Sequence, residues 1–126
     1  MSALNNFSFG GKTVSMEAEN TMAERYVVVE VGGAEGQVDL PSATSDIPFG
    51  IIQETAVAGQ AVPVQTDGIS QCVAGGAIVL GTLVYLQATT GRVDDADTGF
   101  AVGLALSATA ADGEIVIVDL GYKGNA

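Results

Sequence analysis

The sequence offers few side chains that could perform catalysis. Its 126 residues include no histidine and a single cysteine, Cys72. Without histidine there is no Ser-His-Asp or Cys-His arrangement, and one thiol cannot build a multi-thiolate metal site. Cys72 lies between Gln71 and Val73 in an apolar stretch, so we interpret it as a small buried hydrophobic side chain. We therefore expect that the protein is not an enzyme and uses no cofactor.

The feature that most invites a metal ion is an acidic cluster, Asp94-Asp95-Ala96-Asp97. Oxygen-rich loops of this kind can bind calcium. However, no Glu follows at the spacing that an EF-hand loop requires, so the favoured interpretation is a solvated acidic turn without metal. The alternative is a calcium- or carbohydrate-binding β-module, in which substitution of Asp95 and Asp97 would abolish binding.

The net charge excludes some classes of partner. The chain has 15 Asp and Glu against four Lys and Arg, which gives a formal charge of -11. A surface this negative repels phosphate backbones and anionic membranes. We therefore expect no nucleic-acid partner and no membrane partner. Because we see neither a signal peptide nor a membrane-spanning run, we expect a cytoplasm-like compartment.

Residues 1–24 differ in composition from the rest of the chain. They are polar with scattered apolar side chains, and Phe7-Ser8-Phe9 alternates as a short strand would. We expect residues 1–24 to form an extended N-terminal arm that packs less on its own domain, and residues 25–126 to form a single β domain. Phe7 and Phe9, with Leu4, are the predicted anchors of this arm on a neighbouring subunit. The alternative is that both rings fill this chain's own core.

The remainder of the chain is typical of an all-β protein. Short β-branched or alternating runs are separated by glycine turns such as Asp67-Gly68, and no long helical period is present. We predict a small β-barrel or β-sandwich of at least six short strands, with no helix longer than about three turns. The predicted core includes Val27, Val29, Ile51, Val62, Val64, Val84, Leu86, Val116 and Val118.

Two segments echo one another. Residues 55–64 and residues 109–118 both read T-A-x-x-G-[QE]-x-V-x-V, and a glycine-containing apolar strand precedes each. We interpret them as two related β-units that face each other in one barrel or sandwich. This interpretation predicts that Gly59 and Gly113 occupy equivalent loop positions, each leading into a strand. The alternative is a chance similarity in a chain rich in Ala, Gly and Val.

The order of parts across the second half resembles tailed-phage capsid cement proteins, also called head decoration proteins. The resemblance is carried by DIPFGIIQETAVAGQAVPVQTDGI, by VAGGAIVLGTLV and by GLALSATAADGEIVIVDL, which are residues 46–69, 73–84 and 103–120. It covers roughly residues 40–120. The N-terminal arm carries no motif of this family.

The resemblance implies a β-barrel-like domain that binds the outside of a mature phage head and clamps neighbouring major capsid protein subunits, often as a trimer. We therefore expect a non-enzymatic virion structural protein, made in the host cytoplasm, with the major capsid protein as partner. Leu4, Phe7 and Phe9 then become candidate capsid or subunit contacts. A head-fibre or tail component of a phage is the alternative within the same structural class.

Overall fold

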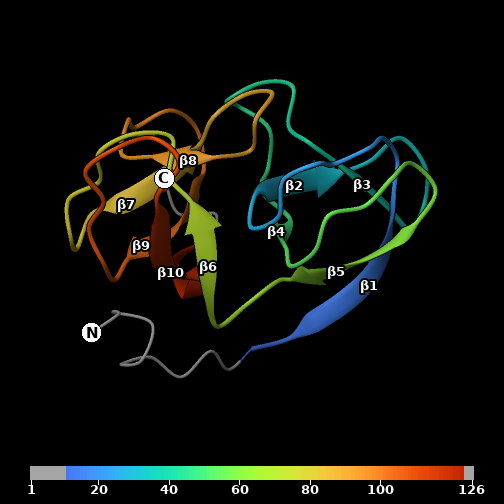
Figure 1. Ribbon diagram of the computed structural model, residues 1–126, viewed down its shortest axis with the longest axis horizontal. Helices are drawn as coiled ribbons and strands as arrows, with labels where there is room; N and C mark the ends of the chain where they lie inside the picture. Colours follow the sequence, from blue (N-terminus) through green and yellow to red (C-terminus); the bar gives the residue numbers. More distant parts are fainter. Residues whose placement is uncertain (1–10, 124–126) are drawn as a thin grey trace.

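The computed structural model describes residues 11–123, which form ten β-strands and one short 3-10 helix, η2 (Figure 1). The first group of strands is β1 (Thr13–Ala18), β2 (Val28–Val31), β3 (Gln37–Asp39), β4 (Gly50–Ile52) and β5 (Ala61–Gln65). The second group is β6 (Ile69–Val73), β7 (Leu83–Leu86), β8 (Val93–Asp94), β9 (Ala101–Ala105) and β10 (Ile115–Asp119), followed by η2 (Leu120–Tyr122). The all-β prediction is confirmed.

Strands β1 to β5 form a closed barrel in the order β1-β3-β2-β4-β5, which we call the first unit (residues 13–65). Antiparallel pairing of β1 with β5 closes it, with Thr13 opposite Gln65 and Glu17 opposite Ala61. On its other side β1 pairs with β3 in parallel. Figure 1 shows this unit beside a second group of strands, β6 to β10.

Strands β6 to β10 form a five-stranded sheet in the order β6-β10-β9-β7-β8. We call this sheet with η2 the second unit (residues 69–122). An isolated parallel bridge joins Ala74, just after β6, to Val93 of β8. The two outer strands of the sheet therefore approach one another, as β1 and β3 do in the first unit.

The two units have the same strand order. If β1 to β5 are matched with β6 to β10 in sequence, both units read third, second, fourth, fifth, first strand across the sheet. The registers also correspond, because Val29 lies opposite Gly50 in the first unit and Val84 opposite Gly103 in the second. Even the sequence before and within the third strand matches, as GQVD at residues 36–39 and GRVD at residues 91–94. The fold is a tandem of two related β units.

The echoed loops confirm the predicted equivalence of Gly59 and Gly113. Both glycines have a positive φ, 87° and 93°, which favours glycine because it has no Cβ. Each lies two residues before a strand, and each donates its N–H over 2.8 Å to a carbonyl at the end of the first strand of its unit, Ala18 O or Ala74 O. The interpretation as two related β-units is thus supported by hydrogen bonding as well as by sequence. The expectation that they face each other in one barrel or sandwich is wrong, because β1 to β5 close a barrel of their own and β6 to β10 form a separate sheet.

Alternation along the strands builds the core. All nine residues of the predicted core are buried, each at 1% exposure or less. Val28 and Ile51 point out of the barrel and pack with the core residues of the second unit, whereas Val29 and Ile52 belong to the core of the barrel. Tyr26 packs against both clusters. The two units are therefore joined through shared apolar packing.

The described part of the expected arm is a barrel strand. Residues 13–18 form β1, in which Thr13, Ser15 and Glu17 face solvent, so that the strand reads as polar in the sequence. Ala18 at its end and Met22 beyond it are buried at 1% and 0% exposure. The expectation of loose packing is therefore wrong for this segment. The division of the chain into an arm and a domain at residue 24 stays a prediction.

Candidate functional site

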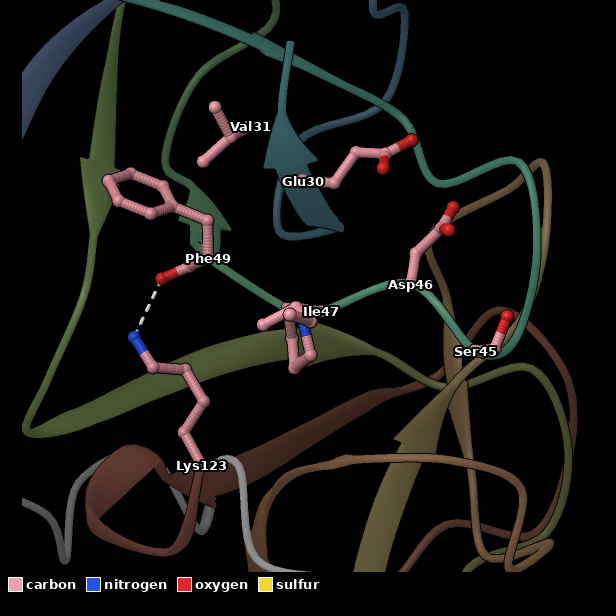
Figure 2. Close-up of a pocket in the computed structure, with 8 residues that line it drawn as sticks. Glu30, Val31, Ser45, Asp46, Ile47, Phe49 and Lys123 are labelled. Atoms are coloured by element: carbon pink, nitrogen blue, oxygen red, sulfur yellow. Dashed lines mark hydrogen bonds between the residues drawn. The ribbon is translucent and has the colours of Figure 1, made fainter.

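An apolar groove lies at one end of the barrel, where β2 ends and β4 begins (Figure 2). Its volume is about 540 Å³, and it is open to solvent. Val31 and Ile47 on its walls are 59% and 67% exposed, which is high for large apolar side chains. The residues that line it are Glu30, Val31, Ser45, Asp46, Ile47, Pro48, Phe49 and Lys123.

The groove follows from how β2 and the connector before β4 are built. Val27 and Val29 point into the barrel, and Val31 is the next residue of the same face, at the open end of the strand. In the connector, the Asp46 carboxylate accepts hydrogen bonds from the backbone N–H groups of Ser42 and Ala43, at 2.9 and 3.0 Å. This turn holds the following Ile47 at the surface.

Lys123 closes one side of the groove. Its Nζ donates to the backbone carbonyls of Phe49 and Thr66, at 2.6 and 2.7 Å, and lies 5.9 Å from the centre of the Phe49 ring. Burial lowers the pKa of this ammonium group, and the charge of Asp67 opposes that shift. Lys123, which follows the second unit, is thereby hydrogen-bonded to the end of the first unit.

Two carboxylates on the rim make it acidic. Partial burial raises the pKa of Glu30, and the charge of Asp46 adds to that shift. The backbone hydrogen bonds from Ala43 and Ser42 lower the pKa of Asp46, so this group stays ionised. An occupant of the groove would meet an apolar floor with a negatively charged edge.

The corresponding end of the second unit is covered. By the strand registers, Leu86 corresponds to Val31 and Tyr85 to Glu30. Leu86 is 1% exposed, and it shares a core cluster with Leu120 of η2. The helix η2 lies against β9 and β6. In the first unit, the turn at residues 66–68 follows β5 in the place where η2 follows β10, and Val31 stays exposed.

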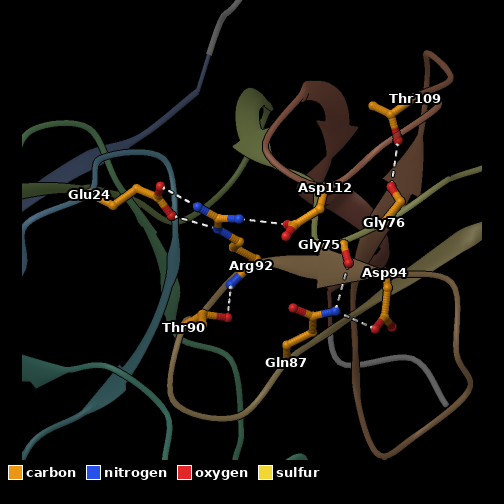
Figure 3. A network of polar contacts seen from close by, with 9 residues as sticks. All are labelled: Glu24, Gly75, Gly76, Gln87, Thr90, Arg92, Asp94, Thr109 and Asp112. Carbon is orange, nitrogen blue, oxygen red and sulfur yellow. Dashed lines mark hydrogen bonds and ion pairs between the residues drawn. The ribbon is translucent and has the colours of Figure 1, made fainter.

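A polar network links the two units on another side of the molecule (Figure 3). Arg92 donates to both carboxylate oxygens of Glu24, at 2.9 and 2.8 Å, and also to Asp112. Nearby, the Gln87 side-chain amide donates to the carbonyl of Gly75 and to the carboxylate of Asp94. This arrangement is a structural clamp between loops, with charges already satisfied within the chain.

The side chains that could bind a metal or act as nucleophiles do not lie together. Asp94 receives its hydrogen bond from Gln87, and among residues 11–123 no group of three or more His, Cys, Asp or Glu is placed to hold a metal ion. Cys72 is fully buried, as interpreted from its neighbours, and this burial raises the pKa of its thiol. No described helix is long and apolar enough to cross a membrane.

The candidate contacts Leu4, Phe7 and Phe9 lie outside the described residues, so their role stays a prediction. The groove was not predicted from the sequence. Two signals could have indicated it. Val31 is the last apolar residue of the run 27–31, directly before Gly32-Gly33, and Ile47-Pro48-Phe49 is an apolar run inside a turn-rich connector. Neither reveals that the two segments meet.

Comparison with known proteins points to one class. The family model described as phage cement protein matches residues 10–120. Among solved structures, the N base of the head fibre protein gp8.5 from bacteriophage phi29 superposes with a TM-score of 0.67 and 16% identity, covering 91% of this chain and 98% of that chain. No curated protein matches the sequence.

Proposed function

Because this chain belongs to the phage cement protein family, we propose that it binds the outer surface of a phage capsid and stabilises contacts between neighbouring major capsid protein subunits. The family match over residues 10–120 is the observation that carries this proposal. Membership makes the chain a phage virion structural protein. The finer assignment, to the capsid exterior and to the major capsid protein, is what remains to be tested.

The physical properties of the chain suit such a role. Two packed β units without a disulfide give a stiff body, and a net charge of -11 disfavours contact with packaged nucleic acid. The groove exposes the apolar side chains of Val31 and Ile47. Such exposed apolar surface is typical of an interaction site. Many copies on an icosahedral lattice would add their individual contacts through multivalency. We propose a homo-oligomer, with a trimer favoured.

Sedimentation with heads from a phage that lacks this protein tests the proposal. Purified protein should co-sediment with expanded heads up to a fixed number of copies and should raise the temperature at which the heads release DNA. Electron cryo-microscopy of the decorated heads should then place it across joints between major capsid protein subunits. Absence of saturable binding to such heads would contradict the proposal.

A truncation experiment on heads must leave β1 intact. Removal of residues 1–24 would delete β1 and open the barrel, so loss of binding would mean only loss of fold. Removal of residues 1–10 leaves every described strand in place. If Leu4, Phe7 and Phe9 are capsid or subunit contacts, this shorter deletion should fold and lose occupancy on heads.

A second candidate function is that of a head-fibre base. The similarity to the N base of the phi29 head fibre protein, over 98% of that chain, favours it. Both candidates place the protein in a virion, and they differ in what it carries. Density for a fibre that projects from each bound copy in the native virion would favour the fibre base, whereas density that ends at the two β units would favour cement.

A further inference from the structure

We propose that a hollow between the two units receives the loop at residues 95–100 of a second copy of this chain, with Phe100 and Asp95 of that loop on Arg25. The inference rests on the proposed function, because it assigns a contact through which the proposed homo-oligomer forms. Both the hollow and the loop lie within the described residues.

The hollow has a volume of about 560 Å³ and lies at the joint between the units. The loops that follow β1 and β4 line it on the side of the first unit, and β6 with the start of β10 on the side of the second. Ile115 at its edge is 38% exposed, so the hollow offers apolar surface that an occupant would cover.

The backbone at Tyr26, in this hollow, is strained. Its φ is 65°, which a residue with a Cβ rarely adopts, whereas Gly81 has a φ of 85° at the same position of the second unit. Tyr26 N donates to Ile52 O over 2.8 Å, and Gly81 N donates in the same way to Ala105 O over 2.9 Å. Strain of this kind clusters at binding sites, where a side chain has a use that outweighs it. The first unit thus has a tyrosine ring where the second unit has only a turn.

Arg25 is stacked on this ring and has no ion-pair partner within the chain. Its guanidinium lies 4.9 Å from the centre of the Tyr26 ring. Both ion pairs among residues 11–123 belong to Arg92, and one of them neutralises Glu24, which also lines the hollow. Arg25 and Glu54 then leave the hollow close to neutral on a chain that carries -11, so another copy is repelled less here than elsewhere. The stacked guanidinium keeps its other face for a second aromatic ring and its edge for a carboxylate.

The loop between β8 and β9 offers both of these groups. Asp95 is exposed, and Phe100, five residues later, is 39% exposed. The other exposed aromatic side chain among residues 11–123 is Tyr122, but the nearby Asp119 carboxylate already accepts a hydrogen bond from Gly121 N. The loop at residues 95–100 is therefore the described segment that matches Arg25.

The loop cannot reach the hollow of its own chain. Ala105 of β9 lies opposite Val118 of the antiparallel strand β10. Phe100 precedes Ala105 by five residues and Ile115 precedes Val118 by three, so the two lie on opposite sides of this pair. About eight residues separate them along the strands, which is roughly 26 Å. The loop must therefore come from another copy.

The N-terminal segment of the same chain does not match the hollow. Residues 1–10 contain no Asp or Glu that could pair with the guanidinium. Gly11 lies beside Asp67, before β6 begins, whereas the hollow borders the far end of β6 at Val73, about 20 Å away. The two phenylalanines of the segment, two and four residues before Gly11, extend only about 7 and 14 Å beyond it.

A loop of one copy in the hollow of the next is a heterologous contact. Such contacts close into rings when the rotation between copies permits it. Each copy gives one loop and receives one, so the inference accounts for a cyclic oligomer such as the proposed trimer.

Disulfide capture in the purified full-length protein tests the inference without capsids. The double variant Phe100→Cys, Ile115→Cys is oxidised with copper phenanthroline, and the fully buried Cys72 serves as an unreactive background thiol. We expect covalent oligomers on a non-reducing gel, joined between positions 100 and 115 as the mass of the cross-linked peptide shows. The largest band then gives the number of copies in the ring.

A matched variant controls for random collision. Phe100→Cys with Val79→Cys, at an exposed residue outside the hollow, should give about tenfold less covalent oligomer, because only thiols held together react at a high effective concentration. A monomer with an internal disulfide between positions 100 and 115 would overturn the inference, and so would the absence of any cross-link between these positions.

Charge reversal tests the role of Arg25. Arg25→Glu, at an exposed side chain, should raise the dissociation constant of the oligomer about tenfold or more in analytical ultracentrifugation, because two carboxylates then meet. Asp95→Arg in the same chain should restore most of that loss. Lys12→Glu makes the same change of charge at an exposed residue outside the hollow and is the control. An effect of Arg25→Glu no larger than that of Lys12→Glu would contradict the inference.

Binding to heads separates this inference from the proposed function. If the cross-link forms but wild-type protein does not sediment with heads, the capsid proposal fails and the subunit contact stands. If Arg25→Glu stays oligomeric but no longer sediments with heads, the hollow faces the capsid, and the inference is wrong while the capsid proposal stands.

Discussion

The first and second units share a strand order but differ at one end. In the second unit the chain continues from β10 into η2, and Leu120 packs over a core that contains Leu86 and Val102. In the first unit the chain turns from β5 through Asp67-Gly68 directly into β6, which leaves Val31 and Ile47 exposed. The core of the second unit is completed by Leu120 of η2 and by Val28 and Ile51 of the first unit, whereas the first unit leaves Val31 at the corresponding end exposed.

The difference separates scaffold from contact surface. Positions that pack strand against strand are matched in the two units, as Gly50 and Gly103 or Val64 and Val118 show. The cap is not matched. A tandem of related units can thus supply stability through one copy and an interaction surface through the other, because only the segments beyond the strands distinguish them.

The largest expected effect is at the capped end. Leu86→Ala should lower the free energy of unfolding by about 2–5 kcal/mol, because it leaves a cavity in a closed core. The corresponding change Val31→Ala should stay within about 0.5 kcal/mol, since this side chain is 59% exposed. Urea unfolding at a protein concentration low enough to keep the chain monomeric measures both. Equal losses would show that the two ends are not different.

The matched glycines should give the next largest effect, and it should be the same in both units. A Cβ at Gly50 would lie 2.5 Å from Gln65 O, and a Cβ at Gly103 would lie 2.4 Å from Val118 Cγ1. Gly50→Ala and Gly103→Ala should each cost about 1–3 kcal/mol through overpacking. Gly76→Ala, with nothing within 4 Å of the added Cβ, is the control. A cost at only one of the pair would break the equivalence of the units.

The ion pairs of Arg92, of which the one with Glu24 joins the two units, should contribute less. Arg92→Gln removes the contacts with Glu24 and Asp112, whose side chains are 42% and 65% exposed, so we expect a loss of roughly 1 kcal/mol or less. Arg92→Lys keeps the charge but not the forked contact with Glu24, so it should recover only part of the stability that Arg92→Gln loses. Thermal unfolding at low and high salt checks this, because the difference from wild type should shrink as salt is added. A loss that salt does not change would point to packing instead.

The smallest expected effect concerns Glu30, which the second unit replaces with Tyr85. Burial and the charge of Asp46 raise the pKa of Glu30 above its ordinary value of 4.5. The folded state therefore binds a proton at Glu30 more tightly than the unfolded state does. The stability that this group contributes is therefore present below about pH 4.5 and is lost as the pH rises through the raised pKa. Asp46 has the opposite sign, because its lowered pKa adds stability that is lost as the pH falls.

Glu30→Gln should accordingly remove the stability loss that wild type shows as the pH rises. We expect the melting temperature of this variant, relative to wild type, to increase between about pH 4 and about pH 7. Glu35→Gln, at an exposed carboxylate outside the groove, is the matched control. A difference that stays flat or decreases over this range would contradict the assignment of a raised pKa to Glu30.

Local periodicity was enough to predict the all-β class and the nine core residues. Val62 and Val64, or Val116 and Val118, alternate within short runs that glycine turns delimit, and the alternation of side-chain direction along a strand is local in sequence. The equivalence of Gly59 and Gly113 was also readable, because the same turn chemistry recurs in the same local order. The segment 13–18 was missed as a core strand because its solvent face is wholly polar.

By itself, the sequence determined that this is an acidic all-β protein with two echoed units, and its motif order indicated the family. Only the tertiary structure decided that β1 closes the first unit against β5, that η2 covers the end of the second unit, and that Val31, Ile47 and Lys123 meet in a groove. Val31 and Lys123 are 92 positions apart in the chain. Contacts at such separation depend on strand register and on the path of the chain beyond each strand, and no local residue pattern encodes either of them.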